Sequence, residues 1–382
     1  MLKNTIKFIQ ETYKTSEFIP LHEPVFLGNE KKYVNDCIDS TFVSSVGKYV
    51  DNFESLMESF TGSAKAVATM NGTASLSAAL YAAGVKRDDL VITQSLTFVA
   101  TGNAIYHSGA HPVFIDISEK SLGLCPHAVS DFLDEFCESD EEGAFHKLTG
   151  QRVRAVLPMH TFGHPVELDE LFAICLKWNL VLIEDAAESL GSFYKGKHTG
   201  TIGQFGTLSF NGNKTITTGG GGMVLCQTEK LGNNIKHITT TAKIPHPFEF
   251  YHDQPGFNYR MPNINAALGC AQIEMIDTYL SQKRNLAKHY ESFFSNTDFK
   301  FFKEPDYATS NYWLNTIISP TEESRDLVLT ETNAAGVMTR PVWTPLHKLP
   351  MFKDFLRDDL LKTEKFAKLL INLPSSPVGD LT

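Results

Sequence analysis

Residues 66–84 read AVATMNGTASLSAALYAAG, and this stretch decides the fold class. AVATM has the apolar character of a short buried strand, and the turn-forming pair Asn71-Gly72 ends it. TASLSAALYAAG is rich in Ala and Leu and predicts a helix. A strand, a glycine turn and a small-residue helix in this order are typical of the start of an α/β unit.

The same alternation continues to about residue 226. Short apolar or β-branched runs predict further strands at 90–93 (LVIT), 113–117 (VFIDI), 152–159 (RVRAVLPM), 180–187 (LVLIEDAA), 206–210 (GTLSF) and 222–226 (GMVLC). Helical patterns separate several of them, at 97–109 and 167–179, and two more helices are expected at 30–40 and 50–62. These runs predict an α/β fold with a mainly parallel sheet covered by helices on both faces.

The sequence changes in character past residue 250. A stretch rich in Pro and aromatic residues, 244–263, precedes one long helical pattern from Ile264 to about Phe294. The remaining residues predict a smaller α+β domain. We therefore expect a large domain over residues 1–250, including an N-terminal segment, and a small C-terminal domain over 251–382.

Composition excludes several classes of partner. The chain has 382 residues, 42% of them hydrophobic, and a formal net charge of −10, which argues against general binding to nucleic acid or to anionic membranes. No apolar run approaches membrane-spanning or signal-peptide length. Its six cysteines are scattered without a C-x-x-C pair, so we expect buried thiols, no metal site and a cytoplasmic location.

One lysine stands beside a glycine run. Residues 209–223 read SFNGNKTITTGGGGM, with Lys214 before Gly219–Gly222. A nucleotide-binding P-loop places its glycines before the lysine, yet the position six before Lys214 is Leu208, so this interpretation fails. Lysine can instead form a Schiff base with a carbonyl group, as it does with pyridoxal phosphate (PLP). The glycines would then allow a tight backbone path beside a bulky cofactor.

Other positions offer the groups that PLP needs. Asp185, at the end of a predicted strand, would pair with the pyridinium nitrogen, although by itself it is more simply a helix N-cap. The turn at 71–74 opens a helix and would bind a phosphate with its N–H groups, or it is merely a cap. Ser209 would add a hydroxyl, and Phe98 would stack on the ring, whereas each has an ordinary strand or core interpretation.

Taken together, these segments resemble one family. MNGTASLSAAL, SLTFVATGNAI, LVLIEDAAESLGS, FGTLSFNGNKTITTGGGGM and GFNYRMPNINAALG, within residues 20–350, resemble the DegT/DnrJ/StrS sugar aminotransferases. The resemblance implies the fold type I PLP-dependent transferase architecture, with a seven-stranded sheet in the large domain. It implies Lys214 as the PLP-linked lysine, Asp185 as the pyridinium partner, Phe98 as the stacking ring, and Gly72, Thr73, Ala74 and Ser209 around the phosphate.

The resemblance also implies roles for residues that the chain's own patterns leave open. Glu188 stands where relatives often have Gln or His near the phenolic oxygen of the cofactor. Members of the family are dimers with shared active sites, so Asn258 and Arg260 are candidates to reach the partner's cofactor phosphate. Arg340 and His347 are candidates to line the sugar-nucleotide pocket. Without the family, Arg260 is an ordinary solvated arginine.

The expected activity is transfer of an amino group from L-glutamate to C4 of a nucleotide-linked 4-keto-6-deoxy sugar. Glu188 makes the chain similar to the branch that acts on UDP-linked N-acetylhexosamine sugars, as in legionaminic acid biosynthesis. The alternatives are a GDP- or dTDP-linked sugar, amination at C3, or a non-catalytic sensor with the same fold. Dehydratases of the family carry His in place of the lysine, so the presence of Lys214 favours transamination.

Overall fold

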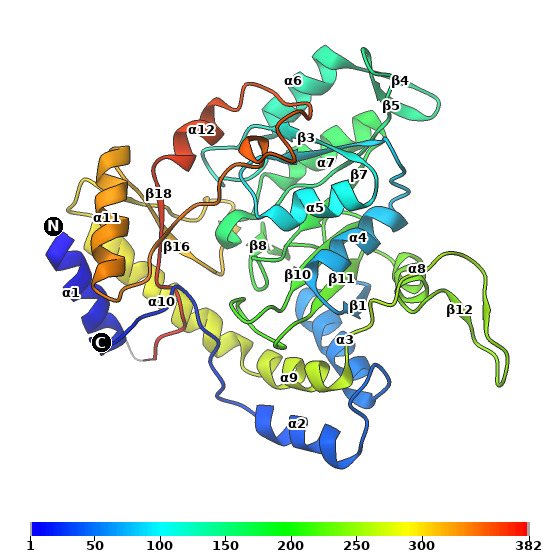
Figure 1. Ribbon diagram of the computed structural model, residues 1–382, viewed down its shortest axis with the longest axis horizontal. Coiled ribbons are helices and arrows are strands. Elements are labelled where there is room, and N and C mark those ends of the chain that lie inside the picture. Colours follow the sequence, from blue (N-terminus) through cyan, green and yellow to red (C-terminus); the bar gives the residue numbers. More distant parts are fainter. Residues whose placement is uncertain (1, 380–382) are drawn as a thin grey trace.

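The computed structural model describes residues 2–379, and its centre is a seven-stranded sheet (Figure 1). Its strands, in spatial order, are β1 (Lys65–Thr69), β11 (Gly222–Cys226), β10 (Phe205–Ser209), β7 (Val181–Asp185), β6 (Val153–Val156), β2 (Leu90–Gln94) and β3 (His111–Ile115). β11 runs antiparallel to both of its neighbours, whereas the pairs from β10 to β3 are parallel. The predicted mainly parallel seven-stranded sheet is confirmed.

Helices cover both faces of this sheet. One face packs against α4 (Gly72–Ala82), α5 (Val99–His107) and α8 (Glu229–Thr239), and the other against α3 (Lys48–Thr61), α9 (Asn263–Ile273), α6 (Pro126–Phe136) and α7 (Leu168–Trp178). Neighbouring residues of a strand point to opposite faces, so Val67 joins the α4 and α8 layer while Ala66 and Ala68 join the α3 and α9 layer. α2 (Glu30–Asp39) packs outside α9.

A smaller, fully antiparallel sheet forms the C-terminal part. Its order is β14 (Lys300–Phe301), β16 (Asn315–Ile318), β18 (Leu370–Leu373) and β17 (Arg340–Pro341), and the helices around it are α1 (Leu2–Tyr13), α10 (Ile276–Phe294), α11 (Glu322–Ala334) and α12 (Leu361–Ala367). This agrees with the predicted α+β domain. The boundary at residue 250 stays a prediction. The packing does not follow it at every element, since α1 packs with the small sheet through Ile9 and α9 packs with the large sheet.

The helical pattern from Ile264 to Phe294 is divided into two helices. α9 ends at Ile273 and α10 begins at Ile276, with Met275 at φ −105° and ψ 4° between them. α9 buries its side chains against α2 and α3, whereas Tyr290 and Phe294 of α10 lie in the core of the small sheet. The break lets one sequence run serve two separate cores, which its periodicity alone did not indicate.

Several short elements lie outside the two sheets. They are the hairpin β4 (Cys137–Asp140) and β5 (Gly143–His146), the sheet of β8 (Phe193–Tyr194), β9 (Lys197–His198) and β15 (Ala308–Thr309), the turns η1 (Thr161–Gly163) and η2 (Leu346–Lys348), and the hairpin β12 (Lys243–Ile244) and β13 (Tyr251–His252). All six cysteines are buried and free. Within residues 2–379, no helix has the length and apolar character needed to cross a membrane.

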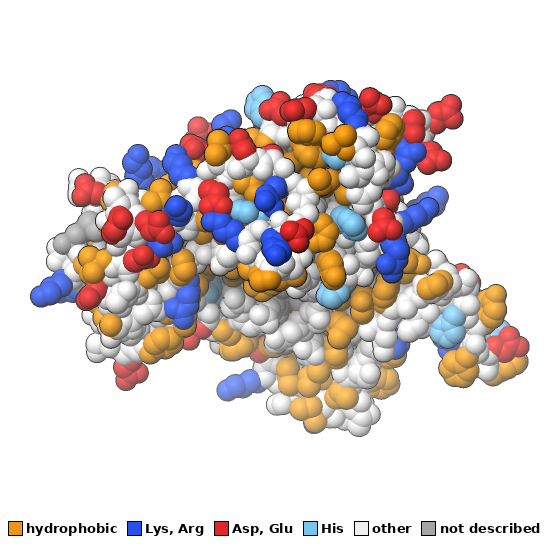
Figure 2. Space-filling model, turned by 45° about the horizontal axis from the view of Figure 1, so that its top comes forward, with side chains coloured by type: hydrophobic (Ala, Val, Ile, Leu, Met, Phe, Trp, Pro, Cys, Tyr) orange, Lys and Arg blue, Asp and Glu red, His pale blue; other side chains and the backbone are white. Residues whose placement is uncertain are grey.

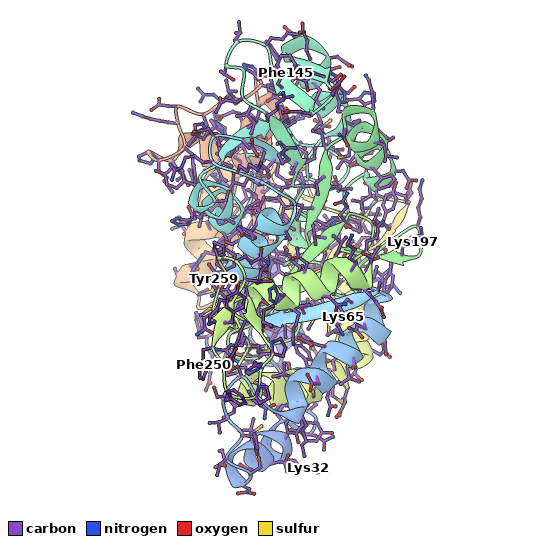
Figure 3. The ribbon with its side chains drawn as sticks, turned by 90° about the vertical axis from the view of Figure 1, so that its right-hand side faces the viewer. Lys32, Lys65, Phe145, Lys197, Phe250 and Tyr259 are labelled. Carbon is purple, nitrogen blue, oxygen red and sulfur yellow. The ribbon has the colours of Figure 1, made fainter. Side chains whose placement is uncertain are left out.

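The β12–β13 hairpin is an arm that projects from the body (Figures 1 and 2). Phe248 and Phe250 on it are 80% and 83% exposed. Phe250 lies on the same side of the molecule as Tyr259, which follows the arm in the chain (Figure 3). The backbone of Tyr259 accepts a hydrogen bond from Met70 at the end of β1, at 2.8 Å. The segment after the arm therefore runs beside the strand edge that carries the Asn71-Gly72 turn.

Glycines allow two strand ends to meet at this edge. Gly222 pairs with both Thr69 and Ser209, and a Cβ there would lie 2.4 Å from the backbone carbonyl carbon of Asn71. A Cβ on Gly72 would lie 2.9 Å from the Cβ of Ser209. The expected tight backbone path is confirmed at Gly222, whereas a Cβ on Gly220 would meet no atom within 4 Å.

We expect Gly222→Ala to lower the free energy of unfolding by about 1–3 kcal/mol, since a backbone carbonyl cannot move aside as a flexible side chain can. Gly220→Ala is the matched control, and its free energy of unfolding should stay within about 1 kcal/mol of the wild-type value. Urea unfolding of the cofactor-free proteins measures both. Equal effects of the two substitutions would contradict the proposed close approach.

Candidate active site

The carboxyl ends of four strands of the large sheet, β1, β2, β7 and β10, lie on one edge, where open α/β sheets bind ligands. A pocket of about 250 Å³ is present there. Its lining residues are Asn71, Gly72, Thr73, Leu76, Phe98, Ala100, Met159, Asp185, Ala187, Glu188, Ser209, Asn211, Asn213, Lys214, Gly220, Gly221, Trp313 and Trp343. Seven of the twelve residues singled out from the sequence are among them.

Lys214 lies at the bottom of a short turn after β10, with its side chain only 12% exposed. Its Nζ is 3.4 Å from Oε1 of Glu188 and 4.0 Å from the centroid of the Trp313 indole. The amine is therefore held between a carboxyl group and an aromatic face. A lysine largely shielded from water is suited to covalent chemistry with a carbonyl compound.

Glu188 is buried beside Lys214. Its Oε2 accepts a hydrogen bond from the backbone N–H of Phe162 at 2.9 Å. Burial raises the pKa of Glu188 to about 7, although the charge of Lys214 acts in the opposite direction. A carboxyl group in this environment can hold or release a proton near neutral pH, next to the amine that would react.

Asp185 ends β7 and is also buried. Its Oδ2 accepts a hydrogen bond from the hydroxyl of Thr101 at 2.8 Å, and its Oδ1 accepts one from the N–H of Ala187 at 3.2 Å. Burial raises the pKa of Asp185, while the Thr101 hydrogen bond opposes that shift. Residues 186–192 form turns and no helix, so the alternative interpretation of Asp185 as a helix N-cap is wrong.

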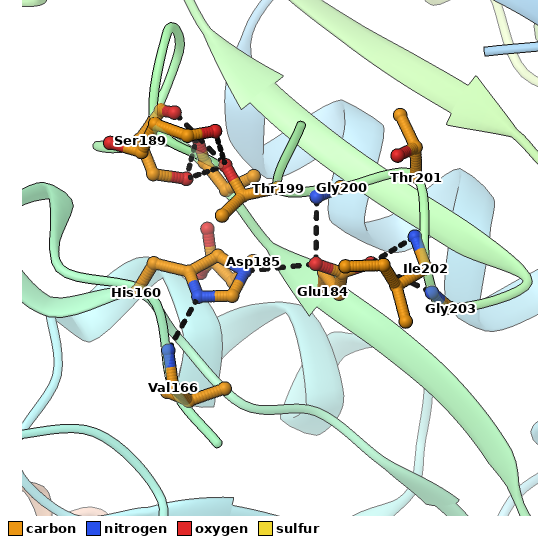
Figure 4. Close-up of polar contacts among 12 residues, drawn as sticks. His160, Val166, Glu184, Asp185, Ser189, Thr199, Gly200, Thr201, Ile202 and Gly203 are labelled. Carbon is orange, nitrogen blue, oxygen red and sulfur yellow. Dashed lines mark hydrogen bonds and ion pairs between the residues drawn. The ribbon is translucent and has the colours of Figure 1, made fainter. Parts of the chain in front are cut away.

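The neighbouring residue, Glu184, points to the other face of β7 and fixes the strand end (Figure 4). It accepts hydrogen bonds from His160 Nε2 at 3.0 Å and from the backbone N–H groups of Gly200, Ile202 and Gly203 at 2.7–2.8 Å. Burial alone would raise the pKa of Glu184, but these hydrogen bonds outweigh it and the pKa is lowered. An ionised Glu184 thus anchors the chain directly beneath Asp185.

The start of α4 forms the end of the pocket suited to an anion. Asn71 caps the helix, since its Oδ1 accepts from the N–H of Ala74 at 2.8 Å. The N–H groups of Gly72 and Thr73 precede the first helical hydrogen bond, from Ser75 to Asn71. With the Ser209 hydroxyl beside Gly72, they suit a phosphate group. Ala74 lies behind the cap and does not line the pocket.

Three aromatic rings form the remaining wall. Phe98 stands at the N-cap position of α5, 49% exposed, so its interpretation as a core residue is wrong. Its ring centroid is 6.2 Å from that of Trp343.

The sequence reasoning missed Trp313, Trp343 and Thr101. The rarity of tryptophan could have indicated the first two, since the chain has only three tryptophans. Thr101 stands three residues after Phe98, in a segment that was already singled out.

Besides Ala74, four predicted residues lie outside this pocket. Arg340 is exposed and donates to Asn333 of α11 at 2.7 Å. His347 bonds Ser95 Oγ at 2.7 Å and Glu364 Oε1 at 2.8 Å, so both of its ring nitrogens are already used. These contacts fix the two side chains away from the pocket.

The other two predicted residues, Asn258 and Arg260, are exposed and bond each other at 3.0 Å, on the segment beside the end of β1. Their position in this chain leaves them outside the pocket that Lys214 lines. The prediction for these residues concerned a neighbouring subunit. It therefore stays a prediction.

The family model for DegT/DnrJ/EryC1/StrS aminotransferases matches residues 27–379. The chain belongs to this family. It is 36% identical over 361 residues to the GDP-perosamine synthase of Escherichia coli O157:H7, covering 94% of each chain. It is 35% identical over 336 residues to EpsN of Bacillus subtilis (strain 168), named as a putative pyridoxal phosphate-dependent aminotransferase, covering 87% of this chain and 84% of that one.

The aminotransferase TlmJ from Streptoalloteichus hindustanus has the same fold, with a TM-score of 0.84, 24% identity and coverage of 94% and 93% of the two chains. Membership of the family makes the protein a PLP-dependent aminotransferase. The pocket fits this cofactor, since an amine, a buried carboxyl group, an anion-binding helix start and an exposed ring line one cavity. No cluster of three or more His, Cys, Asp or Glu side chains that could hold a metal ion occurs in residues 2–379.

Proposed function

We propose that this aminotransferase moves an amino group from L-glutamate to C4 of a GDP-linked 4-keto-6-deoxy sugar. The observation that carries the proposal is the 36% identity, over 94% of both chains, to a GDP-perosamine synthase. Perosamine is a 4-amino-6-deoxy sugar, so its formation by transamination requires a ketone at C4. Membership of the family supports a nucleotide-sugar substrate in general.

The named relatives favour a different nucleotide from the one first expected from the sequence. Glu188 suggested a UDP-linked N-acetylhexosamine and legionaminic acid biosynthesis, but neither is supported by the relatives that name a nucleotide. The alternative of a GDP-linked sugar is the better supported one. Glu188 lies deep in the pocket against Lys214, so it is poorly placed to read a nucleotide.

The polar groups that line the pocket have separate roles in this proposal. Bound PLP supplies an electron sink that stabilises negative charge at the carbon losing its proton. Lys214 would bind the cofactor and, once released, move the proton between substrate and cofactor carbons. Asp185 would keep the ring nitrogen protonated, and Glu188 would hold a proton beside the Lys214 amine. The N–H groups of Gly72 and Thr73 would hold the phosphate.

The intact arrangement favours an enzyme over a non-catalytic sensor or a dehydratase. A sensor would need only to bind, whereas here an amine lies 3.4 Å from a carboxyl group whose pKa of about 7 suits proton exchange. A dehydratase of this family would carry His at position 214. The chain carries Lys214.

We further infer a homodimer with shared active sites. The charged side chains that line the pocket are Asp185, Glu188 and Lys214, so no arginine of residues 2–379 lines the phosphate end within one chain. A phosphate dianion is bound more strongly when a guanidinium faces it. Arg260, exposed beside a projecting apolar arm, would supply that group to a second copy, together with Asn258.

A panel of nucleotide sugars tests the substrate. With glutamate as donor, we expect the GDP-linked 4-keto-6-deoxyhexose to be aminated with a kcat/KM at least about tenfold above its UDP- and dTDP-linked counterparts, a difference of about 1.4 kcal/mol. Product formation is measured by mass spectrometry, with Lys214→Ala as the inactive control. Preference for a UDP-linked sugar would contradict the GDP assignment and leave the aminotransferase activity standing.

Mixing two inactive variants tests the shared site. Lys214→Ala removes the reactive amine and Arg260→Ala the phosphate contact, and each variant alone should have little activity. After subunit exchange in a 1:1 mixture, about a quarter of wild-type activity should return, because half of the dimers are hybrids with one intact site. A mixture as inactive as its components would show that Arg260 serves its own subunit's site or none.

A further inference from the structure

Trp313 is the small-domain residue that lies against the amine of Lys214. The indole centroid is 4.0 Å from Nζ, and the ring is almost completely buried. This is close for a cation–π contact, which is strongest for tryptophan and in sites shielded from water. The carboxyl group of Glu188 is 3.4 Å from the same amine, so Glu188 and Trp313 together define the position of Nζ.

The position of Trp313 is fixed at several points. Its indole N–H donates to the carbonyl of Asn213, the residue before Lys214, at 2.7 Å. Its backbone N–H donates to Asn311 Oδ1 at 2.8 Å, and its carbonyl accepts from the buried amine of Lys283 at 3.2 Å. These contacts join the ring both to the backbone that carries Lys214 and to α10.

The segment that carries Trp313 also holds the rest of the site. The side-chain amide of Asn311 donates to the carbonyl of Glu188 at 2.9 Å and to the hydroxyl of Thr215 at 3.2 Å. Tyr312 has a φ of 48°, in the region that non-glycine residues rarely adopt. A strained residue between two fixed ones indicates that the chain is bent so that the indole reaches the amine.

We propose that Trp313 is a further catalytic residue, whose indole face holds the amino group of Lys214 against Glu188 whenever that lysine is not bonded to the cofactor. This rests on the proposed role of Lys214. The ring restricts an otherwise flexible four-carbon side chain to one place in the pocket. An ammonium group held there can pass its proton to Glu188, 3.4 Å away, so that the free amine meets the aldehyde of an incoming cofactor without a search. After release it returns to the position from which it moves a proton.

The test is the rate at which cofactor-free protein captures PLP covalently, followed by absorbance. Trp313→Leu should slow this capture about three- to thirtyfold, the range that a cation–π contact implies. Its affinity for pyridoxamine phosphate, which has no aldehyde, should stay within about twofold of wild type. Trp313→Phe keeps an aromatic face and should show a smaller loss, so it serves if the leucine variant does not fold.

Trp178→Leu is the matched control. Trp178 also has a lysine over its ring, with Lys177 Nζ 5.4 Å from the centroid, but it lies on α7 and does not line the pocket. Its capture rate should equal that of wild type. The proposal is overturned if both Trp313 variants capture PLP at the wild-type rate, or if pyridoxamine phosphate affinity falls by the same factor. Covalent capture by Lys214→Ala would instead refute the role of Lys214.

Discussion

The contact of a largely buried amine with a buried carboxyl group, Lys214 with Glu188, is the one that the rest of the site depends on. Taking two ionisable groups out of water is costly unless hydrogen bonds and an opposite charge compensate. Here the compensation comes from far apart in the chain, from the N–H of Phe162 and the indole of Trp313. Phe162 and Tyr312, the neighbour of Trp313, both adopt positive φ angles, so local backbone strain accompanies this contact on two sides.

The large sheet brings the chemical groups to one place by its topology. Parallel strands end at a common edge, which places Asp185 and the turn with Lys214 side by side, and Gly72 lets the start of α4 approach Ser209. One pocket is lined both by a helix start suited to an anion and by the groups proposed to transfer protons. A phosphorylated aromatic cofactor needs both at a fixed separation.

Local patterns in the sequence were enough for the sheet and its covering helices, and the family resemblance added seven of the eighteen residues that line the pocket. They were not enough where contacts between residues far apart in the sequence determine the position of a side chain. Trp313 lies 99 positions after Lys214 in the sequence, so no motif around the lysine could indicate it. The substrate-binding roles of Arg340 and His347 stay predictions, and in this structure their side chains bond Asn333, Ser95 and Glu364. The relatives favour a GDP-linked sugar over the UDP-linked sugar inferred from Glu188, a residue that contacts the amine.

The most direct measurement is to locate the covalent cofactor on the chain. Protein purified with PLP is reduced with borohydride, digested and analysed by mass spectrometry. The account predicts a pyridoxyl phosphate group on the peptide containing Lys214, and none on that of Lys283, a lysine that is fully buried. A label on Lys283 or any other lysine, or no stable label at all, would contradict the assignment of the active site.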